Sequence, residues 1–246
     1  MEAEKRGFRL TAAQLRWIAL AAMLLDHLWA MAVPGNQWMT YVGRLAFPIF
    51  AFQIVEGFFH TSDFRRYALR LLVFACVSEI PFDLMYASTA FYPFHQNVMF
   101  TLLLGLAAIW GLERARRERT AGAAVLGVLG LLAAWGAGTA GMVDYGGMGV
   151  LTVVVFYVFR GFPLARLGQL GGLFLLNVAF FQGEYLPVEA FGHVFEFQTQ
   201  GFALLALAPV WLYGGEKGRG GRVLQYGSYA FYPLHMLVLY LIKFMA

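Results

Sequence analysis

AGAAVLGVLGLLAAWGAGTAG, residues 121–141, decides the class of fold, because it contains no charged side chain. A helix of about 20 apolar residues crosses the ~30 Å hydrocarbon core of a bilayer. Its many glycines and alanines permit close contact between helices in lipid instead of breaking the helix. The stretch therefore predicts a transmembrane helix that packs closely against its neighbours.

Comparable apolar stretches recur along the whole chain of 246 residues. Sixty per cent of the residues are apolar and 13% are charged, against about 45–50% and 25% in soluble domains. This composition excludes a soluble globular protein. We predict an all-α fold, a polytopic bundle of about nine transmembrane helices that forms one integral membrane domain over residues 1–246. The expected spans are 14–33, 38–60, 65–87, 95–112, 121–141, 144–160, 164–182, 197–213 and 225–244.

The basic residues predict the orientation of these spans. Sixteen of the 18 Lys and Arg residues lie in or beside every second connection, and short cytoplasmic loops collect such residues. The N-terminus is therefore expected in the cytoplasm and the C-terminus outside. The connection GEYLPVEAFGHVFE, residues 183–196, holds three glutamates and no Lys or Arg, and is expected to be an external loop.

Several functional classes are excluded by simple patterns. The net charge of +4 is explained by topology, and no basic stripe interleaved with aromatics predicts nucleic-acid binding. The single cysteine, Cys76, excludes a disulfide framework. No two histidines have zinc-ligand spacing on one helix, so no metal is expected.

Ionisable groups within the spans predict a site. Each costs about 2.5–3.5 kcal/mol on insertion scales, so such groups usually face a cavity and carry function. In the predicted topology they gather toward the outer leaflet. The ionisable members are Asp26, His27, Arg44, Glu79, Asp83, His95 and Asp144, and the polar Asn97 lies with them.

Helical spacing adds detail to this cluster. Arg16 and His27 are close to three full turns apart, so they share a face and lie ~16 Å apart along the helix. Glu79 and Asp83 also share a face and could orient an imidazole or hold a cationic amine.

Structural interpretations of the same residues remain open. His27 could be a buried histidine bonded to a neighbouring helix, and His95 could cap a helix. Arg44 could form a buried ion pair with Glu79 or Asp83. His235 is expected to bond a tyrosine.

Several motifs resemble one family. LRWIALAAMLLDH (15–27), VGRLAFPIFAFQIVEGFFH (42–60), RLLVFACVSEIPFDL (70–84), FYPFHQNVMFTLLLG (91–105) and YGSYAFYPLHMLVL (226–239) resemble the TraX family of bacterial inner-membrane proteins, named for a protein that N-acetylates pilin. The spacing of Arg16 and His27 is also similar to that in membrane O-acyltransferases of the acyltransferase-three type. Glu56 stands where that family usually has serine.

The resemblance implies an acetyl-CoA-dependent N- or O-acetyltransferase of the inner membrane, with an acceptor outside. It implies His27 as base or acyl carrier, with Arg16 and Arg44 as companions. Further site residues expected on this basis are Glu79, Asp83, His95 and Asn97, with Asn97 or Arg44 stabilising the oxyanion.

The donor phosphates are expected to meet cytoplasmic arginines, because guanidinium pairs well with phosphate. The candidates are Arg65, Arg66, Arg70, Arg114, Arg116 and Arg117. The acceptor could be a protein N-terminus, a glycan, a lipid or a small molecule, and the oligomeric state stays open.

Two other classes compete with this interpretation. A proton-coupled transporter also uses buried His, Asp, Glu and Arg, although no inverted repeat is evident. A haem protein could use His27, His95 and His235 as axial ligands.

Overall fold

The computed structural model describes residues 8–161, 163–181 and 183–245, and most of them are helical. Lys5, Arg6 and the side chain of Arg222, which the charge pattern uses, lie outside this description. The helices are α1 (Ala12–Met31), α2 (Gln37–Gly43), α3 (Ala46–His60), α4 (Phe64–Ala87), α5 (Val98–Glu118), α6 (Ala121–Ala140), α7 (Gly146–Val158), α8 (Ala165–Phe174), η1 (Leu175–Phe180), η2 (Thr199–Ala206), α9 (Leu207–Trp211) and α10 (Gly221–Met245). Two strands, β1 (Tyr185–Ala190) and β2 (His193–Gln198), lie between η1 and η2.

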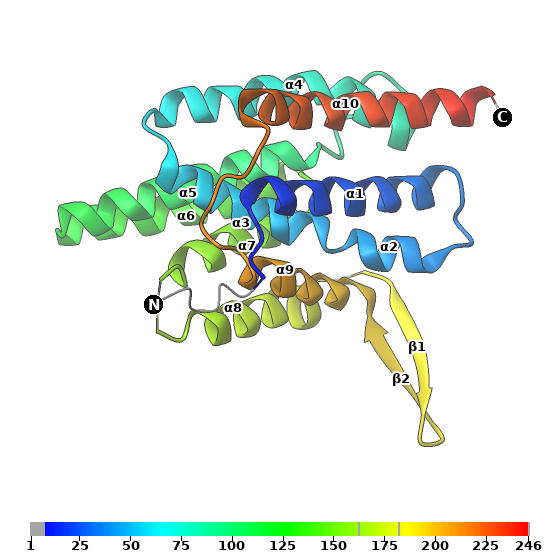
Figure 1. Cartoon of the computed structure of the whole chain (residues 1–246). Helices are drawn as coiled ribbons and strands as arrows, with labels where there is room; N and C mark the ends of the chain where they lie inside the picture. Colours follow the sequence, from blue (N-terminus) through cyan, green and yellow to red (C-terminus); the bar gives the residue numbers. More distant parts are fainter. Residues whose placement is uncertain (1–7, 162, 182, 246) are drawn as a thin grey trace, which may run out of the picture.

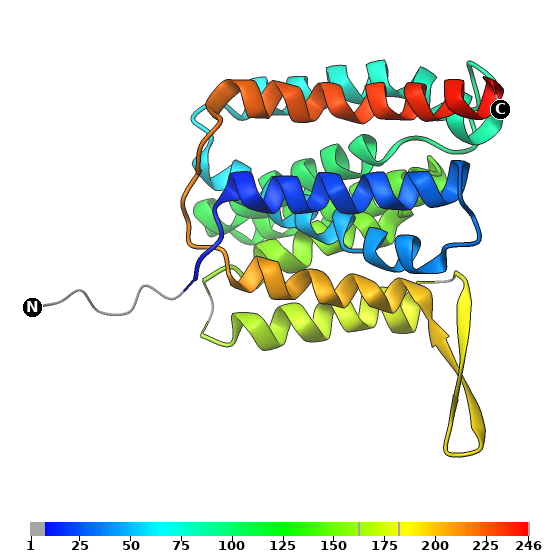
Figure 2. The ribbon, with the colours of Figure 1, turned by 45° about the vertical axis from the view of Figure 1, so that its right-hand side comes forward.

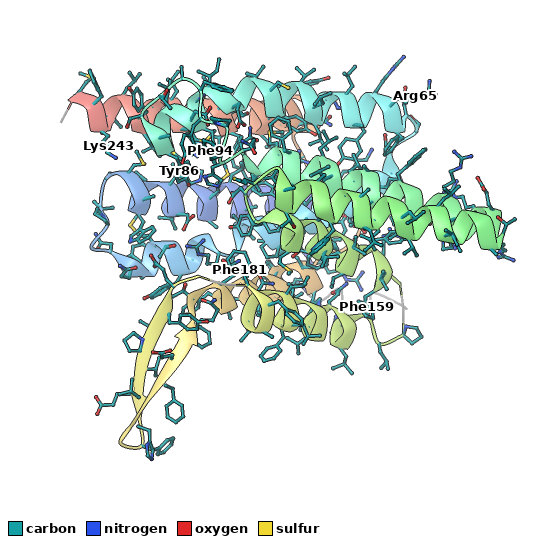
Figure 3. The ribbon with its side chains drawn as sticks, turned by 180° about the vertical axis from the view of Figure 1, so that it is seen from behind. Arg65, Tyr86, Phe94, Phe159, Phe181 and Lys243 are labelled. Carbon is teal, nitrogen blue, oxygen red and sulfur yellow. The ribbon has the colours of Figure 1, made fainter. Side chains whose placement is uncertain are left out.

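The helices lie side by side and the chain reverses direction at two ends of the bundle (Figures 1 and 2). We call the end where α1, α4 and α10 begin the basic end, and the opposite end, which carries the two strands, the hairpin end. Arg65 and Lys243 lie at these opposite ends (Figure 3). The alternation agrees with the predicted order of spans.

Three groups of helices build the bundle. α4 and α10 pack together on one side, α8 and α9 lie on the other, and α1, α3, α5 and α7 lie between them (Figure 2). Fully buried Leu15, Ile49 and Leu106 occupy the middle group. Small residues bring helices close, since a Cβ on Gly105 would meet Val153 at 2.6 Å.

Within the described residues, four helical segments are long and apolar enough to cross a membrane: Gln37–His60, Val98–Glu118, Ala121–Ala140 and Val223–Met245. Shorter apolar helices cover Gly146–Val158, Ala165–Phe180 and Thr199–Trp211. The chain is therefore a helical membrane protein. Helix length and composition identify these segments, and the total of nine membrane crossings stays a prediction.

The predicted span 38–60 is divided into α2 and α3 around Arg44 and Leu45. Pro48 lies one turn later, has no backbone N–H, and cannot bond the Arg44 carbonyl. The helix is interrupted where that hydrogen bond is lost.

The prediction of an entirely α fold is wrong in one segment. The expected external loop forms an antiparallel hairpin, with Tyr185 opposite Gln198 and Ala190 opposite His193. Its turn, Phe191 and Gly192, has φ values of 53° and 75°, as two-residue hairpin turns require. The turn explains why this segment forms strands.

Candidate functional site

Two buried histidines from distant parts of the chain meet inside the bundle. His27 of α1 and His235 of α10 place Nδ1 and Nε2, respectively, 2.6 Å apart. Their rings are nearly parallel, at 3°, with centroids 4.9 Å apart. A short N–N distance between nearly parallel rings at this separation is the geometry of an in-plane N–H···N hydrogen bond.

The surroundings of His235 decide which nitrogens carry hydrogen. Its Nδ1 lies 2.8 Å from the Phe231 carbonyl oxygen, which can only accept, so Nδ1 is the donor. In the neutral ring, Nε2 of His235 is then an acceptor and His27 Nδ1 donates to it. Nε2 of His27 is left with a free lone pair, as a general base requires.

Tyr86 connects this pair to the hairpin end. Its ring centre lies 6.2 Å from that of His27 and 5.7 Å from that of His95. The ring is 45% exposed, and Figure 3 shows it near Phe94. His27 is thus one aromatic side chain away from the surface of the bundle at this end.

Arg44 and Asp26 share the hydroxyl of Thr40. Thr40 Oγ1 donates to Asp26 at 2.6 Å and accepts from Arg44 Nη2 at 3.1 Å. Among the described contacts, Arg44 makes no ion pair with Glu79 or Asp83, and its Nε has no hydrogen-bond partner.

Glu79 and Asp83 bind the segment that leads into α5. The Asn97 side chain donates to Glu79 Oε2 and to the Ala75 carbonyl at 2.8 Å, so both amide hydrogens are engaged. Its oxygen accepts from Met99 N and caps α5. Asp83 accepts from Tyr92 N at 2.8 Å, while its other oxygen, Oδ1, is buried without a partner.

His95 lies opposite a carboxylate at the surface of the hairpin end. Its Nε2 is 3.8 Å from Asp144 Oδ1. The Asp144 carboxylate raises the pKa of His95 above its usual value, while partial burial opposes this and Glu79 and Asp83 assist it. His95 therefore stays protonated to a higher pH than a free histidine.

A cavity of about 500 Å³ opens at the basic end. It is bordered by the first turns of α1 and α10, the end of α3 and the first part of α4. Arg16, Arg70, Lys217 and Arg219 supply its positive charge. Among the described residues, Arg70 Nε is buried and has no hydrogen-bond partner, so it can donate to an anion in this cavity.

A second, narrower cavity of about 100 Å³ continues from the first toward the histidines. The two share Arg16, Gln53 and Tyr229 in their linings. The narrow cavity also reaches Met23 and Tyr232, one helical turn before His27 and His235. The two cavities together therefore extend from the basic end to within one helical turn of the histidine pair, and the lining of the narrow cavity is mostly apolar.

The predicted phosphate-binding arginines do not all lie at this cavity. Arg70 lines it, whereas Arg66 pairs with Asp63 at 3.0 Å and Arg65 lies at the outer start of α4 (Figure 3). Arg114 pairs with Glu118 at 2.6 Å. Arg116 and Arg117 both bond Glu113, and Arg114 and Arg117 line a separate cavity between α3 and α5.

Sequence reasoning missed two features of the site. It expected a tyrosine partner for His235, which instead bonds His27, because spacing within α10 cannot show that α10 packs on α1. It also used Lys217 and Arg219 only to predict which side of the membrane is cytoplasmic, and not as site residues. Both lie in the Gly-rich connection before α10, which folds back to the start of α1.

The fold and site define a helical membrane protein with a buried histidine pair and a basic cavity at one end. The chain belongs to the TraX family, whose model, described as TraX protein, matches residues 11–243. This confirms the family predicted from the motifs. The chain is also 36% identical over 115 residues to "Probable fimbrial assembly protein FimC, serogroup H1" of Dichelobacter nodosus. That match covers 42% of this chain and 47% of the relative, and no solved structure matches.

Proposed function

We propose that this protein is a transmembrane acetyltransferase that moves an acetyl group from acetyl-CoA to an amine or hydroxyl acceptor. The observation that carries the proposal is the pair of adjoining cavities that extends from the basic end to within one helical turn of the His27–His235 pair. In a bacterial inner membrane the basic end would face the cytoplasm, where the donor is made, and the hairpin end would face the acceptor.

The basic cavity suits the phosphates of the donor. Arg16, Arg70, Lys217 and Arg219 would bind these phosphates, and the unpartnered Arg70 Nε is a free donor for such a bond. The mostly apolar narrow cavity is compatible with the uncharged thioester arm. This assignment replaces Arg65, Arg66, Arg114, Arg116 and Arg117 as the donor site, because those side chains lie elsewhere or pair with carboxylates.

His27 would act as the general base through Nε2. It would take a proton from the acceptor as the acceptor nitrogen or oxygen attacks the thioester carbonyl carbon. The carbon–sulfur bond would then break, and the thiolate would take the proton from His27. The alternative is attack by His27 itself to form a transient acyl-histidine.

His235 would position His27 and stabilise its protonated ring. The Phe231 carbonyl fixes the tautomer of His235, whose Nε2 accepts the hydrogen of His27 Nδ1. A hydrogen-bonded orienting group serves the same purpose for the base of other acyl-transfer enzymes.

Arg44 is the better of the two predicted oxyanion donors. Its Nε is free, whereas Asn97 already uses both amide hydrogens. Glu79, Asp83 and His95 would line the path of the acceptor. The negative charge of the two carboxylates would favour a cationic amine.

The similarity to a fimbrial assembly protein supports one class of acceptor. Because a fimbrial assembly protein is similar to this chain over 115 residues, we propose a fimbrial or pilin subunit amine as the acceptor. The subunit would be reached from the hairpin end.

Purified protein incubated with labelled acetyl-CoA and an amine-bearing peptide tests the activity. We expect release of coenzyme A and label on the peptide. A proton-coupled transporter would instead accumulate a solute in vesicles that contain no acetyl donor, and a failure to bind or cleave acetyl-CoA would reject the acetyltransferase.

A further inference from the structure

The hairpin formed by β1 and β2 has two chemically different faces. Residues paired across antiparallel strands point to the same side. One side therefore carries the pairs Leu186 with Phe197 and Val188 with Phe195, with His193 on the same side next to the turn, and we call it the apolar face. The opposite side, the acidic face, carries Pro187 with Glu196 and Glu189 with Val194.

The hairpin projects sideways from the bundle, across the direction of the helices (Figures 1 and 2). It begins and ends at the level where η1 finishes and η2 starts. In a bilayer crossed by the helices, such an arm lies along the membrane surface.

Both faces contact the bundle at the base of the hairpin. On the apolar face, Phe197 packs edge-on against Phe202 of η2 with ring centres 5.2 Å apart, and Phe202 stacks on Tyr41 of α2. On the opposite side, Gln198 is buried and its Nε2 donates to the Phe181 carbonyl oxygen at 2.8 Å.

Beyond the base the two faces differ in chemistry. Glu189 and Glu196 of the acidic face are exposed, and the apolar face carries neither carboxylate.

The apolar face lacks a protein cover beyond this base. Phe195 is 53% exposed and Phe191, at the tip, is 98% exposed. A lone two-stranded hairpin is marginally stable in water, so this much uncovered apolar surface needs a partner. Leu167, Leu170 and Phe174 of α8 are also exposed, and α8 leads through η1 to the hairpin.

We infer that the hairpin is an interfacial anchor, with its apolar face in the lipid–water boundary and its acidic face in water. The boundary suits it better than the hydrocarbon core, because the outer edges of two strands carry unpaired backbone groups that need water. Aromatic residues favour this boundary, and the apolar face and tip supply three phenylalanines. The inference requires only that the helices cross a bilayer and goes beyond the proposed acetyl transfer.

Single cysteines on neighbouring residues test this placement in the full-length protein. Cys76 is exposed on α4, so it is first replaced by serine. Val188→Cys and Glu189→Cys then lie on opposite faces of one strand, and each is labelled with an environment-sensitive fluorophore in phospholipid vesicles.

We expect the label at 188 to be quenched at least several-fold more by brominated lipid chains than by aqueous iodide, and the label at 189 to show the reverse. Phe195→Cys and Glu196→Cys repeat the comparison on the other strand, so a folding defect of one variant does not decide the result. Equal quenching of the two faces, whichever quencher dominates, would overturn the inference. Iodide as the stronger quencher on both faces would favour an arm held in water for a protein partner.

Discussion

At the residue scale, the hydrogen bond between His27 and His235 is the feature on which the proposed chemistry depends. Each ring is almost fully buried, and each would be costly in the interior without the other as partner. The chain of Phe231 carbonyl, His235 and His27 leaves one basic nitrogen, His27 Nε2, for a reacting group. The position of that nitrogen depends on His235.

Replacing His235 tests this dependence. We expect His235→Ala to lower kcat by about 10²-fold to 10⁴-fold with little change in the KM for acetyl-CoA, because the base loses its orientation. His235→Gln should recover part of the rate, since its amide oxygen can accept from His27 Nδ1.

Steady-state rates across pH measure the effect, with the exposed hairpin variant His193→Ala as control. A pH profile and kcat that stay at wild-type values in His235→Ala would contradict the positioning role.

His95 gives a prediction about pH. Because the Asp144 carboxylate raises the pKa of His95 in the folded protein, their attraction stabilises the fold fully below about pH 6.5 and is lost as pH rises through the raised pKa. Both side chains are about one-third exposed, so solvent limits the gain to less than about 1 kcal/mol.

Asp144→Asn should therefore lower the pKa of His95, and should lower the thermal midpoint more at pH 6 than at pH 9. Glu79 and Asp83 remain and should keep part of the shift. NMR titration of the His95 ring measures the pKa directly, and an unchanged value would show that Asp144 is not its cause.

Asn97 separates a structural from a catalytic role. Asn97→Ala removes the α5 cap and the side-chain bonds to Glu79 and to the Ala75 carbonyl, and should lower the free energy of unfolding by about 2 kcal/mol or more. Thr120→Ala, which removes only the cap of α6, should cost about 1 kcal/mol. If thermal midpoints in detergent show equal losses while Asn97→Ala alone loses activity, Asn97 is an oxyanion donor after all.

At the element scale, the first turns of α1 and α10 and the start of α4 bring positive charge into one cavity. Sequence position does not reveal this grouping. Arg66 and Arg70 are one turn apart on α4, so spacing alone places both on similar faces of the helix. Arg70 lines the cavity, whereas Arg66 pairs with Asp63 outside it.

These two arginines form a matched pair for testing the donor site. We expect Arg70→Ala to raise the KM for acetyl-CoA about 10-fold or more, the loss of one charge-assisted bond to a phosphate. Arg66→Ala should leave the KM unchanged. Initial rates at varied donor concentration measure both, and an equal effect of the two variants would place the phosphates elsewhere.

The sequence predicted the helices and part of the site for physical reasons that have clear limits. Long apolar runs and the spacing of basic residues predicted where the chain reverses, because every backbone polar group in lipid must be bonded within a helix or barrel. The hairpin was missed because the alternation of apolar and polar residues in its strands spans only a few positions, and a Pro and two Gly residues lie among them. The His27–His235 contact depends on the packing of α1 against α10, which residue spacing along one chain cannot supply.

At the scale of the whole molecule, the two ends of the bundle have different chemistry. The basic end holds the cavity for an anionic donor, and the hairpin end holds His95, Asp144 and the acidic face of the hairpin. The buried histidine pair lies between them. This arrangement allows donor and acceptor to approach from opposite sides of a membrane.

We propose that the protein transfers an acetyl group between these two sides, with His27 as its base or acyl carrier. The most direct measurement uses vesicles that contain the protein, labelled acetyl-CoA inside and a membrane-impermeant amine peptide outside. Wild-type protein should label the peptide, and His27→Ala should bind acetyl-CoA with unchanged affinity yet transfer no label. Equal labelling of the peptide by His27→Ala and the wild type would contradict the claim.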